Sequence, residues 1–323
     1  MYRKHPILAI IDSGIINYNY FKNKISGGIS FYIRDNTLYS NNQFNDECGH
    51  GTNCAYIICK HCQNVELYIV KIIDATRNCS SILLLEALEH LLHIEVDIIN
   101  ISLSVESDSL KDEIIEVLQR LHNQGKEIFI SIKNGKVSSF PANVKCCYGV
   151  SGEWLKDNVY YYNIKSGNHI IGNSTPEYSF GVNNEYNWFG SNSKSTALMS
   201  ASIANSLIQQ GNRSVTDIIR KNSIDLVQMS EYSLKLVKRS LELDERKIYE
   251  KLIPLFTPYL DRNIIQSIQY KDEIIRDKSF YLIKKSEDIL KVKINIDNIT
   301  YNDFYTLENF SHYIHDNVNV IIE

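Results

Sequence analysis

The sequence has 323 residues, enough for one large domain or two smaller ones. Its 44% hydrophobic and 22% charged residues are typical of a soluble globular protein. The formal net charge of −4 excludes a general electrostatic attraction to nucleic acid or anionic membranes, so we expect neither as a partner.

The N-terminal stretch and the cysteines indicate the cellular compartment of the protein. "MYRKHPILAIIDSGI" has basic residues followed by a run of only six apolar residues before Asp12, too few for a signal-peptide core. No apolar run approaches the about 20 residues that a membrane span needs. Seven cysteines, an odd number without an export signal, indicate a reducing compartment. We therefore expect a cytoplasmic protein.

Cys59 and Cys62 have the spacing of one half of a zinc site, but the sequence has no second well-spaced pair of cysteines, so no metal site is assigned.

From residue 7 to about 210, short apolar runs alternate with amphipathic stretches. The apolar runs "ILAIID", "VELYIVKII", "VDIINISL", "EIFISI" and "CCYGVSG" predict buried strands, and "SSILLLEALEHLLHI" and "SLKDEIIEVLQRLHN" predict helices between them. This alternation predicts an α/β fold with a parallel sheet covered by helices on both faces. The polar segments 34–48 and 165–192 are predicted to be loops that form the rims of a cleft.

The composition changes after about residue 210. "SVTDIIRKNSIDL" predicts a helix that closes the first domain, and the charged "SEYSLKLVKRSLELDERK" predicts a connector. "RKIYEKLIPLFTPYL" and "YTLENFSHYIHDNV" carry apolar residues at helical spacing. We expect a first domain over 1–225, a linker over 226–245 and a small helical domain over 246–323.

Three stretches of the first domain carry polar residues that packing does not require. Asp12 ends an apolar strand in "AIIDSG", and by itself it suits a turn or a helix cap. His50 lies between glycines in "DECGHGTNCAYII", where structural and chemical roles are equally open. "FGSNSKSTALMSA" has four serines, and small hydroxyl residues before an apolar run usually begin a helix.

Taken together and in this order, "IIDSG", "GHGT" and "SKSTA" resemble the subtilisin-like serine proteases. The resemblance implies a subtilisin-like sheet and a catalytic triad of Asp12, His50 and Ser195, with Ala197 as the small residue two positions after the nucleophile. It implies ordinary turn or helix roles for the remaining serines, which are Ser191, Ser193 and Ser200.

Two further stretches extend the resemblance. "VDIINISLS" resembles the strand that lines the substrate cleft, which implies that Ser102, Leu103 and Ser104 contact an extended peptide. "EIFISIKNGKVSSFPANV" resembles the segment that holds the oxyanion-hole asparagine, which would be Asn134. The implied activity is a serine endopeptidase: His50 takes the serine proton, Asp12 orients the imidazole, and Asn134 stabilises the oxyanion.

The chain departs from the family pattern at four positions. Lys133 and Ser104 replace usual glycines, Met199 replaces a proline, and Lys194 replaces a small residue before the predicted nucleophile. These changes favour a narrow substrate range. Only eleven residues precede Asp12. In this short N-terminal segment the chain resembles the intracellular and maturation branches of the family. Relatives often carry calcium, but no cluster here is distinctive enough to assign as its ligands.

The C-terminal stretch resembles an acyl-carrier-type helical bundle. A carrier needs a serine directly after an aspartate, whereas the nearest serine, Ser279, follows Lys278. We therefore expect no phosphopantetheine on Ser279 and no other cofactor. An unrelated helical docking domain is nearly as good an interpretation.

Two hypotheses about function follow. In the first, the protein cleaves an extended peptide or protein substrate, such as the leader of a ribosomally made precursor peptide, and its C-terminal domain docks a maturation enzyme. In the alternative, the protein is a catalytically silent scaffold that holds a peptide in the cleft while the C-terminal domain recruits a modifying enzyme.

Overall fold

The computed structural model describes residues 5–16, 19–76, 79–105, 109–163, 168–181, 186–210, 214–234, 240–259 and 278–318. It divides into two compact units. The first unit comprises Met1–Thr175, Gly181–Asn183 and Gly190–Ser233, and the second comprises Pro176–Phe180, Asn184–Phe189 and Leu234–Glu323. This division differs from the one expected at 225 and 246, because the second unit also takes up a segment from the middle of the chain.

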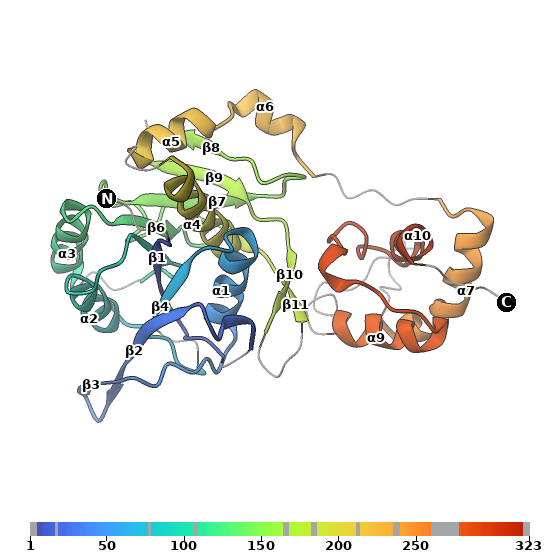
Figure 1. Ribbon diagram of the computed structural model, residues 1–323, viewed down its shortest axis with the longest axis horizontal. Helices are drawn as coiled ribbons and strands as arrows, with labels where there is room; N and C mark the ends of the chain where they lie inside the picture. The colour runs from blue at the N-terminus through green and yellow to red at the C-terminus, as the bar shows by residue number, and fades with distance from the viewer. Residues whose placement is uncertain are drawn as a thin grey trace. The chain divides into compact units, whose positions relative to one another are not determined.

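The first unit is built on one nine-stranded sheet with the strand order β3-β2-β4-β1-β5-β6-β7-β9-β8 (Figure 1). All neighbouring pairs are parallel except β2–β3 and β8–β9, the pairs at the two edges. The strands are β1 (Ile7–Asp12), β2 (Ile25–Arg34), β3 (Thr37–Asn41), β4 (Glu66–Lys71), β5 (Ile98–Ile101), β6 (Glu127–Ser131), β7 (Tyr148–Glu153), β8 (Tyr161–Asn163) and β9 (His169–Asn173). The predicted α/β class and parallel sheet are confirmed.

Helices cover both faces of this sheet, with α2 and α3 on one face and α1 and α4 on the other (Figure 1). Their bounds are α1 (His50–His61), α2 (Ser81–Leu91), α3 (Lys111–Asn123), α4 (Ser191–Gln210), α5 (Val215–Asn222) and α6 (Leu226–Glu231), with a short 3-10 helix at Asn19–Phe21.

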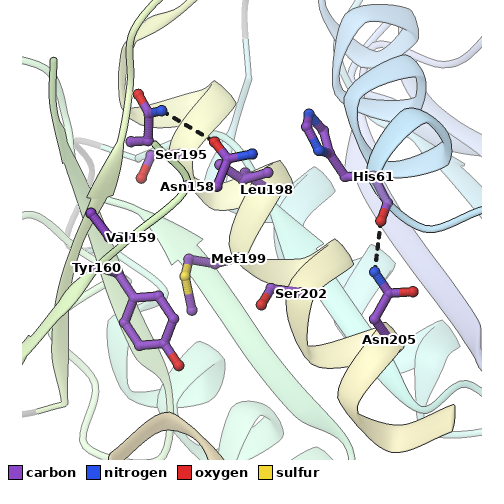
Figure 2. Close-up of a pocket in the computed structure, with 10 residues that line it drawn as sticks. His61, Asn158, Val159, Tyr160, Ser195, Leu198, Met199, Ser202 and Asn205 are labelled. Carbon is purple, nitrogen blue, oxygen red and sulfur yellow. Dashed lines mark hydrogen bonds between the residues drawn. The ribbon is translucent and has the colours of Figure 1, made fainter. Parts of the chain in front are cut away.

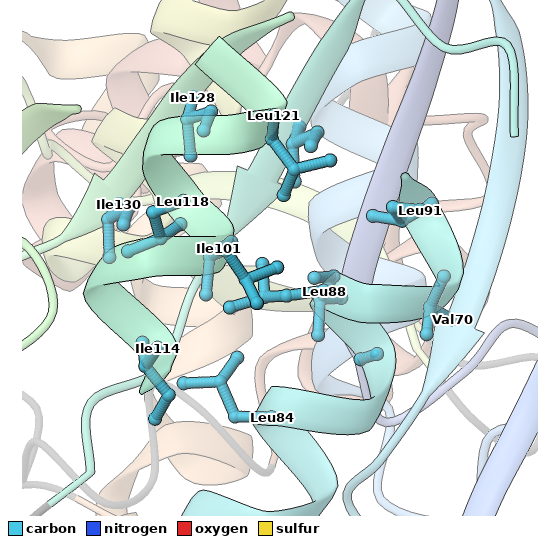
Figure 3. Packing of buried hydrophobic residues seen from close by; sticks show 14 of the residues in the cluster. Val70, Leu84, Leu88, Leu91, Ile101, Ile114, Leu118, Leu121, Ile128 and Ile130 are labelled. Atoms are coloured by element: carbon cyan, nitrogen blue, oxygen red, sulfur yellow. The ribbon is translucent and has the colours of Figure 1, made fainter. Parts of the chain in front are cut away.

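The two faces follow from the alternation of side chains along each buried strand. Ala9 and Ile11 of β1 point to the α2–α3 face, where they join one hydrophobic cluster. Figure 3 shows aliphatic side chains of both helices packed against the sheet, among them Leu84, Leu88, Leu118 and Leu121, all with 0% exposure. Burying such a side chain contributes about 1.5–3 kcal/mol, so this layer fixes the sheet that carries the site.

Parts of the two predicted rim loops are strands instead. Segment 34–48 contains β3, and segment 165–192 contains β9 and the hairpin strands β10 (Glu177–Phe180) and β11 (Tyr186–Phe189). The polar surface of these segments suggested loops, but an edge strand or a hairpin needs only one apolar face, so its sequence is half polar.

The second unit packs helices around the β10–β11 hairpin. Its helices are α7 (Leu243–Phe256), α9 (Ser279–Leu290) and α10 (Leu307–Asn317), with 3-10 turns at Thr257–Tyr259 and Ile296–Asn298. Tyr178 and Trp188 of the hairpin lie edge to face with ring centroids 4.3 Å apart, and Trp188 also contacts Tyr301 and Phe304. These rings join Leu252 and other helix residues in one core. No helix in the described ranges has the length and apolar character to cross a membrane.

Candidate active site

A buried carboxylate and a histidine meet where β1 ends. Asp12 is the last residue of β1 and has 0% exposure. Nδ1 of His50 lies 2.8 Å from Oδ1 and 2.9 Å from Oδ2 of Asp12, and Oδ1 also accepts the backbone N–H of Ser13. The His50 side chain is one-third exposed. A proton on Nδ1 facing the carboxylate makes Nε2 the basic nitrogen of the neutral ring. The two predicted residues therefore form an acid–imidazole pair.

Asp46 organises the first turn of α1, which carries His50. Its Oδ1 accepts the backbone N–H groups of Cys48 and Gly49, and its Oδ2 accepts the N–H and hydroxyl of Thr52. A buried acid beside a helix N-terminus satisfies free N–H groups and opposes the positive end of the helix dipole. Asp46 was not among the predicted site residues, although an acid four residues before a helix start is a recognisable signal.

Gly51 allows α1 to begin directly against the end of β1. A Cβ atom at this position would lie 2.4 Å from the carbonyl oxygen of Gly14 and 3.2 Å from Cβ of Asp12. Below the pair, Sγ of Cys54 lies 3.8 Å from Oδ2 of Asp12. Burial, and then the negative charge of Asp12, raise the pKa of the Cys54 thiol well above its usual value. Cys54 is therefore a neutral thiol that faces the carboxylate.

The first turn of α4 is tied to the carboxyl ends of β6 and β7. The side chain of Asn192 donates to the carbonyl of Ile132 at 2.8 Å and accepts the N–H of Gly152 at 2.9 Å. The backbone N–H of Asn192 donates to Oδ1 of the exposed Asn134 at 3.3 Å. The predicted oxyanion residue therefore lies beside the start of α4. Asn192, whose side chain holds this turn in place, was not among the predicted site residues.

The structure places Ser195, the predicted nucleophile, beyond this first turn, with its hydroxyl held inside the fold. Its side chain has 0% exposure, and its hydroxyl donates to the backbone carbonyl of Ser151 at 3.0 Å. The face of α4 that carries it packs on β7 and β9: a Cβ atom on Gly172 would lie 2.7 Å from Oγ of Ser195. A hydroxyl committed to a buried carbonyl lacks the access to substrate that attack requires.

Ser195 instead lines a cavity beside α4 (Figure 2). The cavity is bounded by the C-terminal half of α1, at His61, by the segment Asn158–Tyr160, and by the α4 residues Leu198 and Met199. Asp12, His50 and Asn134 are not among the described residues that line it. The alanine two positions after Ser195, on which its predicted role rested, also suits a buried helix face of small residues.

The predicted substrate residues directly follow β5. Ile11 of β1 pairs with Ile101 of β5, so the next residues along the two parallel strands, Asp12 and Ser102, are neighbours at the same edge of the sheet. Ser102 and Leu103 are 7% and 9% exposed, and Ser104 is more open. The structure therefore brings the predicted substrate segment beside the Asp12–His50 pair.

Comparisons with known proteins agree with this architecture. The model of the subtilase family matches residues 3–220, more than half of the chain. The structure is similar to that of Sphericase, with a TM-score of 0.57 and 17% identity, covering 68% of this chain and 82% of that one. It is also similar to the S41 psychrophilic protease, with a TM-score of 0.55, 18% identity and the same coverage. No curated protein sequence matches significantly. The chain belongs to the subtilase family of serine peptidases.

Proposed function

We propose that this subtilase is a serine endopeptidase whose nucleophile is Ser193, with His50 as the general base and Asp12 as the residue that orients His50. The observation that carries the proposal is the hydrogen-bonded Asp12–His50 pair at the carboxyl edge of the sheet. In open parallel sheets this edge is where reacting groups gather.

The starts of α1 and α4 support the proposal because they lie at the same end of the fold. Asn205 of α4 donates to the carbonyl of His61, the last residue of α1. Both helices rise about 1.5 Å per residue, so counting back eleven residues sets His50 level with Lys194. A serine in the first turn of α4 is therefore at the height of the histidine.

The direction of Ser193 follows from helix periodicity. Ser200 donates to Oδ1 of Asn100 on β5, so its face of α4 packs on β5. Ser193 is seven residues earlier, which is nearly two full turns and returns it to within about 20° of the same face. Ser195 is about 140° away from Ser200, on the β7–β9 side.

The position of Ser193 along the strand direction also agrees with a place beside Asp12 and His50. Two turns correspond to about 10 Å, or about three strand residues, which sets Ser193 near Leu103 and next to the end of β1 that carries Asp12. Ser193 is 7% exposed, and no hydrogen bond holds its hydroxyl within the described part of the chain. This hydroxyl is thus not committed to a buried carbonyl as that of Ser195 is.

The chemistry follows from these groups. Oγ of Ser193 attacks the scissile carbonyl while His50 takes its proton at Nε2, and the resulting imidazolium is stabilised by Asp12. His50 then gives the proton to the leaving amine, and water hydrolyses the acyl-enzyme by the same route. Because Oδ1 of Asn134 accepts from Asn192, its amino group is the donor directed to the oxyanion, together with the N–H of Ser193, which has no intrahelical partner in the first turn.

Labelling with a fluorophosphonate probe tests the assignment, because the probe forms a bond only with an activated serine. We expect the wild type to be labelled on the peptide that contains residues 191–200, and S193A to lose the label. S195A is the matched control on the same helix and should keep it. A label that survives in S193A and disappears in S195A would return the nucleophile to Ser195. A wild type without label would favour the silent peptide-binding scaffold.

The narrower role that we propose is cleavage of a precursor peptide in the cytoplasm. All seven cysteines are free thiols, which supports a reducing compartment. Incubation with candidate precursors should give one defined cut by mass spectrometry, and unselective cleavage of denatured casein would contradict this role.

For the second unit, we propose that it docks a maturation enzyme and that its helices are related to those of acyl-carrier proteins. Ser279 has 0% exposure, which supports the expectation that it carries no phosphopantetheine.

A further inference from the structure

Two carboxylates and two imidazoles meet between α7 and α10 of the second unit. Glu245 comes from the first turn of α7, and His312, His315 and Asp316 from the last turns of α10. Spacings of three and four residues set the α10 side chains on one face of the helix. We call these four residues the acid–imidazole cluster. It lies in the second unit and takes no part in the proposed peptidase chemistry.

The cluster is tightly connected. Nδ1 of His312 lies 2.5 Å from Oε1 of Glu245, and its Nε2 lies 3.1 Å from Oδ2 of Asp316. Nδ1 of His315 lies 3.1 Å from Oδ1 of Asp316. Glu245 is only 2% exposed, and its other oxygen accepts the N–H of Glu242 and so caps α7. The carboxylate is thus fixed in place before any ligand arrives.

The spacing suits a metal ion. One ligand atom from each of Glu245, His315 and Asp316 lies within 4.8 Å of the others. Around a tetrahedral zinc ion with bonds of about 2.0–2.2 Å, neighbouring ligand atoms are about 3.3–3.6 Å apart. Closing the site therefore requires each side chain to move by little more than about 1 Å. His315 and Asp316 are half exposed and have the freedom to make this adjustment.

The donor set indicates the class of ion. One imidazole nitrogen and two carboxylate oxygens suit a first-row divalent transition metal, whereas calcium and magnesium prefer oxygen ligands alone. His312 faces both carboxylates, and a hydrogen-bond donor of this kind orients the ligating groups.

We propose that the acid–imidazole cluster binds one divalent transition-metal ion of the zinc class through Glu245, His315 and Asp316, with His312 as a positioning residue and water completing the coordination. The ion would join the first turn of α7 to the last turn of α10 and so stabilise the second unit.

Calorimetric titration of the full chain with Zn²⁺, and absorption spectra with Co²⁺, test the site. Asp12, His50 and Cys54 also have metal-like spacing, so each titration is repeated in H50A. We expect the wild type and H50A each to bind one Zn²⁺ ion with the same affinity. H315A and D316N should bind Zn²⁺ at least about tenfold more weakly. The control is H122A, which removes an exposed histidine from the end of α3.

Circular dichroism of the variants establishes that the loss of binding is not a loss of folding, since His315 and Asp316 lie at the surface. Zn²⁺ should also raise the unfolding temperature of the wild type and not that of H315A. Equal affinity in the wild type and H315A, loss of binding only in H50A, or no binding by the wild type would each overturn the proposal. None of these outcomes depends on peptidase activity.

Discussion

Glu127 should make the first unit less stable as the pH rises. It begins β6, and its Oε2 is buried without a hydrogen-bond partner among the described residues. Burial raises the pKa of its carboxyl from the usual value of 4.5 to about 7. The folded state therefore holds a proton that the unfolded chain releases near pH 4.5, and its stabilising effect is present below that pH and is lost as the pH rises through about 7.

The perturbation is E127Q, which keeps the shape of the protonated side chain and removes the titration. The rise of the Glu127 pKa from 4.5 to about 7, at about 1.4 kcal/mol for each tenfold change in the acid constant, corresponds to about 3–4 kcal/mol as an upper limit. We expect E127Q to match the wild type near pH 4.5 and to be more stable by up to about 3–4 kcal/mol near pH 8. Urea unfolding at both pH values, followed by circular dichroism, measures the difference.

The control is E116Q, because Glu116 is exposed on α3 and its carboxylate stays hydrated when the chain folds. A difference between E127Q and the wild type that is equal at both pH values would refute the reasoning. So would a loss of stability in E127Q near pH 8, because the amide would then be the poorer group in this site.

Two further predictions concern the start of α1 and the core of the second unit. D46A removes the acceptor for the backbone N–H groups of Cys48, Gly49 and Thr52, so it should lower kcat of the proposed peptidase and destabilise the first unit by about 1–2 kcal/mol. The control E116A, on the exposed face of α3, should change neither. Unchanged kinetics in D46A would contradict the positioning role. W188A should destabilise the second unit by about 3–5 kcal/mol in scanning calorimetry, while W154A, which truncates a 40%-exposed ring of the first unit, should leave that transition unchanged; equal effects would show that Trp188 is not a core residue.

Much of the first unit could be predicted from local pattern. The apolar runs that became β1, β4, β5 and β6 are buried on both faces, and this makes them distinct from the amphipathic α2 and α3. Asp12 and His50 could be found only together, because each alone also suits a structural role, whereas "IIDSG", "GHGT" and "SKSTA" in this order resemble the subtilisin-like serine proteases.

The sequence alone determined that this chain forms a helix-covered parallel sheet, because hydrophobic period and turn residues are local properties. The resemblance to a family implied the Asp12–His50 pair, and the tertiary structure brought the two side chains together. Only the tertiary structure separated Ser193 from Ser195, since two serines two positions apart differ in the face of α4 they occupy, and packing against β5, β7 and β9 decides which face is buried. It also drew the β10–β11 hairpin into the second unit and brought Glu245 to α10. Such contacts join residues far apart in the chain, and no local pattern contains them.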